Sequence, residues 1–143
     1  MKADKFFIFD FDSTFTRVEA LDVLCEISLR GNDQKEEILR QVKNITNTCM
    51  EGNMSFRESL ESRLALLNAH RDHLPVLIER LKENISRSFE RNIKFFQENA
   101  DSIYILSNGF KEFIVPIVTE YGVHEDHVYA NEFNYDESGN ISG

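Results

Sequence analysis

The chain has 143 residues, of which 41% are hydrophobic and 12 are phenylalanine, enough apolar material for the core of one folded domain. Its formal net charge of −9 disfavours nucleic acids and anionic membrane surfaces as partners, because both are negatively charged. Cys25 and Cys49 fit no disulfide or metal-ligand spacing. Since no signal peptide or long apolar run accompanies them, we expect a cytoplasmic protein with two ordinary thiols.

The most informative stretch is Lys5–Thr16, in which an apolar run leads directly into acidic residues. Asp10 follows Phe6–Phe9, and Asp12 and Thr14 come at alternate positions after it. The apolar run predicts a strand that is buried on both faces, as in a parallel sheet. Ligands bind in the crevice at the carboxyl ends of the strands in such sheets. We therefore expect the two acids to lie at a ligand-binding crevice.

Helical patterns dominate the chain after this strand. Cys49–Met54 interrupts the periodicity and predicts a loop. Helices are predicted over Glu19–Leu29, from a start capped by Asp33 with the stripe Ile38, Val42 and Ile45, from the capping box Ser55–Glu58 with the stripe Phe56, Leu60, Leu64 and Leu67, from a start capped by Asp72, and from a start capped by Ser88. We expect residues 17–86 to form a helical cap subdomain of roughly seventy residues.

The C-terminal part predicts further strands. Ile103–Leu106 predicts a second buried strand, a helix over Phe110–Tyr121 follows it, and Val128–Ala130 predicts a third strand. Asp136–Asn140 has the turn residues of a hairpin. We therefore expect an α/β fold in which residues 1–16 and 87–143 form an incomplete, Rossmann-like parallel sheet core, with the helical cap inserted after the first strand.

Asp10 and Asp12 have two possible roles. Neighbouring carboxylates both ionise only when a cation lies between them or one keeps a proton, and Mg²⁺ binds one or two carboxylates together with phosphate oxygens. One Asp could form an aspartyl-phosphate as the nucleophile, and the other could serve as general acid and base. Alternatively, both simply cap a turn, where Asp is common.

A second turn, Ser107-Asn108-Gly109, follows the second apolar strand. A hydroxyl followed by backbone N–H groups at a helix N-terminus can bind phosphate, although an ordinary N-cap has the same appearance. Because both turns follow parallel strands, we expect them to face the same crevice.

Phe9-Asp10-Phe11-Asp12-Ser13-Thr14 together with Ile105–Phe110 resembles the haloacid dehalogenase superfamily of phosphotransferases, and within it the phosphoserine phosphatase family. The resemblance extends over the chain from Phe6 onward and includes Val128–Asn131. It implies that Asp10 is the nucleophile and a Mg²⁺ ligand. Asp12 would be the general acid and base and would offer its carbonyl oxygen to the metal.

The resemblance also implies a substrate site for a small phosphorylated amino acid. Glu19 would bind the amino group and Arg63 the carboxylate, with Met50 in the same site. Taken singly, Glu19 and Arg63 are better explained as surface charges of helices than as ligand-binding residues, and only their joint match to the family indicates the substrate site. The residues implied for the phosphoryl group are Thr14, Ser107, Asn108 and Gly109. Glu51 and Asn108 depart from the family, which usually has glycine at both places.

The family also needs a lysine after the hairpin and a Gly-Asp-Gly turn after a further strand, and no residue after Asn131 matches either one. The first strand would then be an exposed apolar edge. We therefore expect an inactive piece of a longer protein, or a homodimer in which a second copy covers that edge. The alternatives are a phosphatase for another small phosphomonoester, a non-catalytic module that binds a phosphorylated ligand, and a receiver domain. We expect His70, His73, His124 and His127 to be surface histidines.

Overall fold

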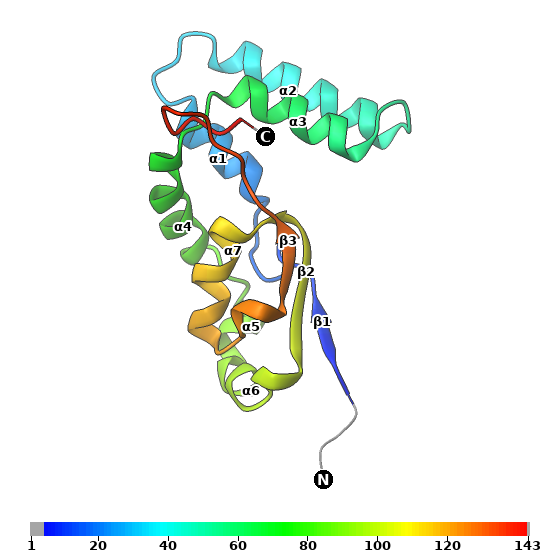
Figure 1. Cartoon of the computed structure of the whole chain (residues 1–143), viewed down its shortest axis with the longest axis vertical. Helices are drawn as coiled ribbons and strands as arrows, with labels where there is room; N and C mark the ends of the chain where they lie inside the picture. Colours follow the sequence, from blue (N-terminus) through cyan, green and yellow to red (C-terminus); the bar gives the residue numbers. More distant parts are fainter. Residues whose placement is uncertain (1–4, 143) are drawn as a thin grey trace. The chain divides into compact units, whose positions relative to one another are not determined.

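The computed structural model describes residues 5–142 (Figure 1). The chain divides into two compact units. One combines the chain up to Val23 with Pro75–Glu132, and the other combines Leu24–Leu74 with Phe133–Gly143. The division into a core and a cap with boundaries at residues 16 and 87 stays a prediction.

A parallel sheet forms one layer of the first unit (Figure 1). Its three strands are ordered β1 (Phe7–Phe9), β2 (Ile103–Phe110) and β3 (Val128–Asn131). The predicted α/β class and the parallel direction of the strands are therefore confirmed. β1 lies at an edge of the sheet, and within residues 5–142 it pairs only with β2.

One face of the sheet is covered and the other is open. The rings of Phe7 and Phe9 contact those of Phe95 and Phe89, at centroid distances of 5.1 and 5.4 Å. Ile8, which points to the opposite face, is 67% exposed. The prediction of a first strand buried on both faces is therefore wrong, because alternate side chains of a strand enter different faces and only one face is packed here. The expected burial of Leu106 is wrong for the same reason, since it is 60% exposed.

Helices α5 (Arg87–Arg91), α6 (Ile93–Glu98) and α7 (Lys111–Val118) belong wholly to the first unit. The single helix predicted from Ser88 is two short helices instead, and the N-cap residue of α5 is Ser86. After α7 a 3₁₀ turn leads to Gly122, whose φ of 87° is the left-handed conformation that ends the predicted helix there. Two further helices begin in one unit and end in the other, namely α1 (Ala20–Ser28) and α4 (Leu74–Lys82).

Two long helices, α2 (Lys35–Met50) and α3 (Phe56–Leu67), lie side by side in the second unit (Figure 1). The capping box of α3 is confirmed: Glu58 N–H donates to Ser55 Oγ over 3.1 Å, and the Glu58 side chain accepts from Ser55 N–H. The start of α2 was predicted one residue early, because its N-cap is Gln34 and lacks a side-chain cap. The helix also continues to Met50, so the predicted loop begins only at Glu51.

A 3₁₀ helix over Arg71–His73 precedes α4, and its N-cap is His70 rather than the expected Asp72. His70 Nδ1 accepts from Asp72 N–H over 3.0 Å, and its Nε2 therefore donates to the Ser138 carbonyl, 2.8 Å away. His70 thus ties the predicted turn at Asp136–Asn140 to this helix and is more than a surface histidine. Within residues 5–142 no helix combines the length and apolar character needed to cross a membrane.

Candidate active site

Phe11, which stands between the two acids, anchors the turn after β1. It is completely buried, and its ring lies 5.8 Å from that of Phe15 and 6.0 Å from that of Phe113. Its carbonyl oxygen accepts hydrogen bonds from the backbone N–H groups of Thr14, Phe15 and Thr16. The packing of the Phe11 ring in the apolar core therefore fixes the backbone of the turn, and Asp10 and Asp12 flank this buried residue.

Asp10 and Glu19 are both exposed, and each accepts a short hydrogen bond. Asp10 Oδ1 accepts from the N–H of Phe11 over 2.6 Å, and Glu19 Oε1 accepts from the hydroxyl of Ser13 over 2.6 Å. Ser13 has a left-handed backbone with φ of 57°. Short polar residues tolerate this conformation better than most non-glycine residues do, and it lets the turn reverse tightly after Asp12.

Asp12 is half-buried and has an unusual acidity. Its Oδ1 accepts from the N–H of Ala20, the first residue of α1, over 2.7 Å. Burial raises the pKa of Asp12 to about 6, the Ala20 hydrogen bond opposes this rise, and the nearby charges of Glu19, Asp10 and Asp22 add to it. A carboxyl group with a pKa near neutrality can both give and take a proton, as general acid–base catalysis requires.

The second turn is a bulge in β2. Leu106 pairs with Tyr129 and Phe110 pairs with Asn131, so Ser107, Asn108 and Gly109 all lie opposite Ala130 alone. Helix α7 begins only at Lys111. The expected N–H groups therefore belong to a bulge in the strand and not to the first turn of a helix, because Phe110 continues the ladder with β3.

Gly109 joins the two turns. A Cβ atom built on it would lie 3.2 Å from Asp12 Oδ2, 3.2 Å from Ser107 Oγ and 3.2 Å from Phe113 Cζ. The N–H of Gly109 donates to Ser107 Oγ over 2.9 Å. The Asp12 carboxylate and the Ser107 hydroxyl therefore both lie beside Gly109, and the shared crevice itself stays a prediction.

The other residues of the predicted site are placed as follows. Thr14 is exposed, and its carbonyl oxygen accepts from Ser86 Oγ over 2.6 Å. Met50 is the last residue of α2 and is 81% exposed. Arg63 lies on α3, where its Nε donates to the Ser59 carbonyl over 3.3 Å. Met50 and Arg63 belong to the second unit and the acids to the first, so the roles of these two residues stay predictions.

Three contributors were not identified from the sequence. Each of them contacts a predicted site residue. The Ser13 hydroxyl donates to Glu19, and the N–H of Ala20 donates to Asp12. The side-chain Nδ2 of Asn131 donates to the Asn108 carbonyl over 3.0 Å. Asn131 and Asn108 are distant in sequence and meet only across the sheet, so no local pattern reveals the contact.

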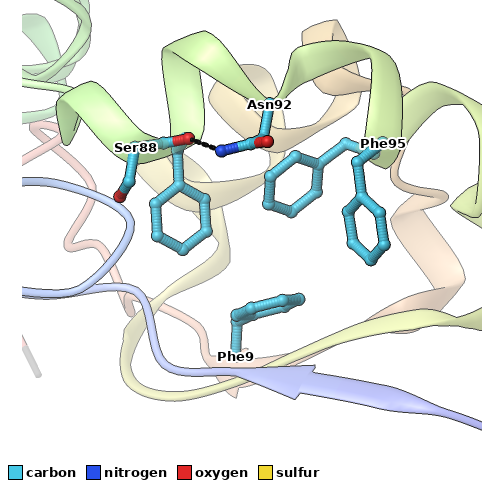
Figure 2. A pocket seen from close by; sticks show the side chains of 6 residues that line it. Phe9, Ser88, Asn92 and Phe95 are labelled. Carbon is cyan, nitrogen blue, oxygen red and sulfur yellow. Dashed lines mark hydrogen bonds between the residues drawn. The ribbon is translucent and has the colours of Figure 1, made fainter.

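A pocket of about 320 Å³ lies beside β1 (Figure 2). Aromatic rings dominate its lining, and the Asn92 side chain donates to the Ser88 carbonyl at its rim. Because no charged side chain of residues 5–142 lines it, this pocket does not suit a phosphorylated ligand. Its lining residues in that range are Phe9, Ser88, Phe89, Asn92, Phe95 and Phe96.

Asp10 and Asp12 provide hard oxygen donors for a cation. Within residues 5–142 no group of three or more His, Cys, Asp or Glu side chains could hold a metal ion. Mg²⁺, however, is usually held by one or two carboxylates, with waters and substrate phosphate oxygens completing its shell. The Asp10 carboxylate and the Asp12 carbonyl oxygen therefore fit Mg²⁺ in the presence of a phosphorylated ligand, and they do not form an all-protein metal cage.

A parallel sheet with acids after one strand and a serine turn after the next defines an α/β protein that carries polar turns at the carboxyl ends of its strands. Residues 7–143 match the family model of the haloacid dehalogenase-like hydrolases. The chain belongs to this family.

Similar proteins carry phosphoserine phosphatase names. A phosphoserine phosphatase of Methanocaldococcus jannaschii is 32% identical over 135 residues, which covers 91% of this chain and 56% of the relative. A phosphoserine phosphohydrolase-like protein of Francisella tularensis superposes with a TM-score of 0.79 at 26% identity, over 97% of this chain and 63% of its own. A phospho-aspartyl intermediate analogue of phosphoserine phosphatase superposes with a TM-score of 0.71 at 26% identity, over 99% of this chain and 62% of its own. The chain spans about half the length of the curated relatives it matches.

Proposed function

We propose that this chain carries the nucleophile and the acid–base group of a phosphatase that acts on a small phosphorylated amino acid, O-phosphoserine. The observation that supports this most strongly is the close packing at Gly109, beside which lie both an acid with a raised pKa and a serine hydroxyl. The names of similar proteins, and the solved phospho-aspartyl analogue among them, support the same reaction.

In this proposal Asp10 attacks the phosphorus atom. One carboxylate oxygen is held by the N–H of Phe11, and the exposed side chain can present the other oxygen to the substrate. A bond forms between Asp10 and phosphorus while the bond from phosphorus to the serine oxygen breaks. Asp12 gives its proton to the departing serine oxygen, and it then takes a proton from the water that hydrolyses the aspartyl-phosphate.

Ser107 and its neighbours hold the phosphoryl oxygens. Because Ser107 Oγ accepts from the N–H of Gly109, its own proton is available to donate to a phosphoryl oxygen. The exposed Asn108 and Thr14 provide further donors. Mg²⁺ bound to the Asp10 carboxylate and the Asp12 carbonyl would neutralise charge on the phosphoryl group.

Glu19 and Arg63 give the proposed substrate its identity as an amino acid. An amino acid is a zwitterion, so a carboxylate and a guanidinium together can recognise both of its charges. Glu19 is already oriented by the Ser13 hydroxyl. A different small phosphomonoester would not need this pair of opposite charges.

A second candidate is a non-catalytic module that binds a phosphorylated ligand. Such a module would keep the two turns for binding without turnover.

Phosphate release from O-phosphoserine in the presence of Mg²⁺ tests the proposal. We expect turnover by a full-length version of the protein, which Asp10→Asn abolishes and Arg63→Ala slows mainly by raising KM, and we expect no turnover by this chain alone. Binding without any turnover, measured by calorimetry with O-phosphoserine, would favour the binding module. Equal turnover by Arg63→Ala would contradict the role of this arginine.

A further inference from the structure

We infer that Asn131 is a positioning residue, whose side-chain amide holds the Ser107–Gly109 bulge in the shape that binds the phosphoryl group. This inference rests on the proposed function for the identity of the ligand. Its structural part rests on the sheet register and on one hydrogen bond, and it can be tested separately.

The bulge needs support because it interrupts the ladder between β2 and β3. Residues of β2 that lie in the bulge have no regular partner across the sheet, so their backbone groups need other partners. Asn131 supplies one, since its Nδ2 donates to the Asn108 carbonyl over 3.0 Å. Asn131 itself pairs with the buried Phe110, which resumes the ladder after the bulge. The backbone of Asn131 is therefore held where its side chain can cross the gap.

The position of the Asn108 carbonyl affects the predicted phosphate-binding groups directly. The peptide group that carries this carbonyl also carries the N–H of Gly109, because the two atoms share one rigid plane. That N–H donates to Ser107 Oγ over 2.9 Å, and a Cβ atom built on Gly109 would lie 3.2 Å from Asp12 Oδ2. A rotation of this one peptide plane would therefore disturb the Ser107 hydroxyl and its spacing from Asp12 together. Asn131 restrains that rotation.

The neighbouring ion pair provides a matched control. Lys111 Nζ lies 3.6 Å from Glu132 Oε1, so this pair also connects the region after the bulge to the end of β3. The Glu132 side chain is 70% exposed, and exposed ion pairs contribute little to stability. Glu132→Gln changes the residue after Asn131 without touching the amide contact.

The experiment compares Asn131→Asp and Asn131→Ser with Glu132→Gln and the unmodified chain. Asn131→Asp keeps the size of the side chain but replaces the amide donor with an oxygen that faces the Asn108 carbonyl oxygen. Asn131→Ser removes the amide without adding charge, which covers the case in which the first variant fails to fold. Hydrogen exchange of the Gly109 amide, followed by NMR, reports the shape of the bulge. Titration with inorganic phosphate and Mg²⁺ reports its use.

We expect the Asn131 variants to speed exchange of the Gly109 amide about fivefold or more, and to weaken phosphate binding by a similar factor, while Glu132→Gln leaves both unchanged. Unchanged exchange in the Asn131 variants, or an equal effect of Glu132→Gln, overturns the positioning role. Faster exchange in a chain that binds no phosphate confirms the structural restraint, overturns the assigned ligand, and counts against the proposed function as well. Normal phosphate binding by the Asn131 variants together with faster exchange overturns the link to the ligand alone.

Discussion

Replacing Gly109 with alanine tests whether the two turns form one site. The added Cβ would meet Asp12 Oδ2, Ser107 Oγ and Phe113 Cζ, each at 3.2 Å, which is tighter than ordinary van der Waals contact. The Phe113 ring is completely buried and cannot move away. Asp12 is restrained as well, since its other oxygen accepts from Ala20 N–H over 2.7 Å. The methyl group must therefore separate Asp12 from the Ser107 hydroxyl by a few tenths of an ångström.

Two opposing effects set the cost of Gly109→Ala. Overpacking a tight site typically lowers the free energy of unfolding by about 1–3 kcal/mol. Gly109 is not in the left-handed region, so alanine also gains about 0.4–1 kcal/mol from reduced freedom of the unfolded chain. We expect a net loss of about 1 kcal/mol, which corresponds to a decrease in Tm of roughly 4 °C for a chain of this size. Affinity for inorganic phosphate should fall more steeply, by about tenfold, because a loss of about 1.4 kcal/mol in binding has that effect.

The assay is urea unfolding together with a phosphate titration, and Gly31→Ala is the control. Gly31 has a φ of 77°, and no atom lies within 4 Å of its built Cβ. Alanine there should cost about 1–2 kcal/mol through backbone strain alone and leave phosphate affinity unchanged. Two results together would refute the close approach at Gly109. Gly109→Ala would unfold at the same urea concentration as the parent chain, and its affinity for phosphate would lie within twofold of the affinity of the parent chain.

Three further predictions concern stability. Ser55→Ala removes the capping box of α3 and should lower the free energy of unfolding by about 1 kcal/mol in urea titrations, and an unchanged midpoint would contradict the cap. Phe11→Ala should cost about 3–5 kcal/mol, whereas Phe6→Ala, at a position 67% exposed, should change stability by less than about 0.5 kcal/mol; thermal melts compare them, and equal effects would count against the anchor. Burial and the charge of His70 lower the pKa of His73, so the unfolded state binds protons more readily than the folded state does. Stability should therefore decrease as pH falls through about 6.5, and it should decrease less in His73→Gln. Urea midpoints measured from pH 8 to pH 5 would reveal this difference.

The elements that depend on local chemistry could be predicted from the sequence. The Ser55–Glu58 capping box forms as expected because both partners lie within one helical turn. Asp12, after the first strand, and Ser107, after the second, both lie beside Gly109, because parallel strands bring their carboxyl ends to the same edge. The first residue of α2 could not be predicted in this way. Asp33 and Gln34 are adjacent polar residues, and only the tertiary structure decides which of them is the N-cap.

Burial of the sheet could not be predicted in the same way. Phe6–Phe9 has the continuous apolar pattern of a strand covered on both faces, yet Ile8 is exposed while Phe7 and Phe9 find aromatic partners. A run of apolar residues shows that both faces of a strand can be buried, whereas their actual burial depends on the elements that cover each face. The Asn131 contact was hidden for a related reason: the register of β3 against a bulged strand depends on the whole sheet.

The candidate site is held from two directions, and the two directions can be separated by mutation. Burial of Phe11 anchors the acid turn in the core, and the absence of a side chain at Gly109 allows the serine turn to approach Asp12. Phe11→Ala releases the first restraint, so stability and phosphate binding should fall together. Gly109→Ala leaves that anchor in place and pushes Asp12 from the other side, so binding should fall further than stability does. The ratio of the two losses therefore distinguishes a site that depends on its core anchor from one that depends on close approach, and we expect the two variants to differ in this ratio.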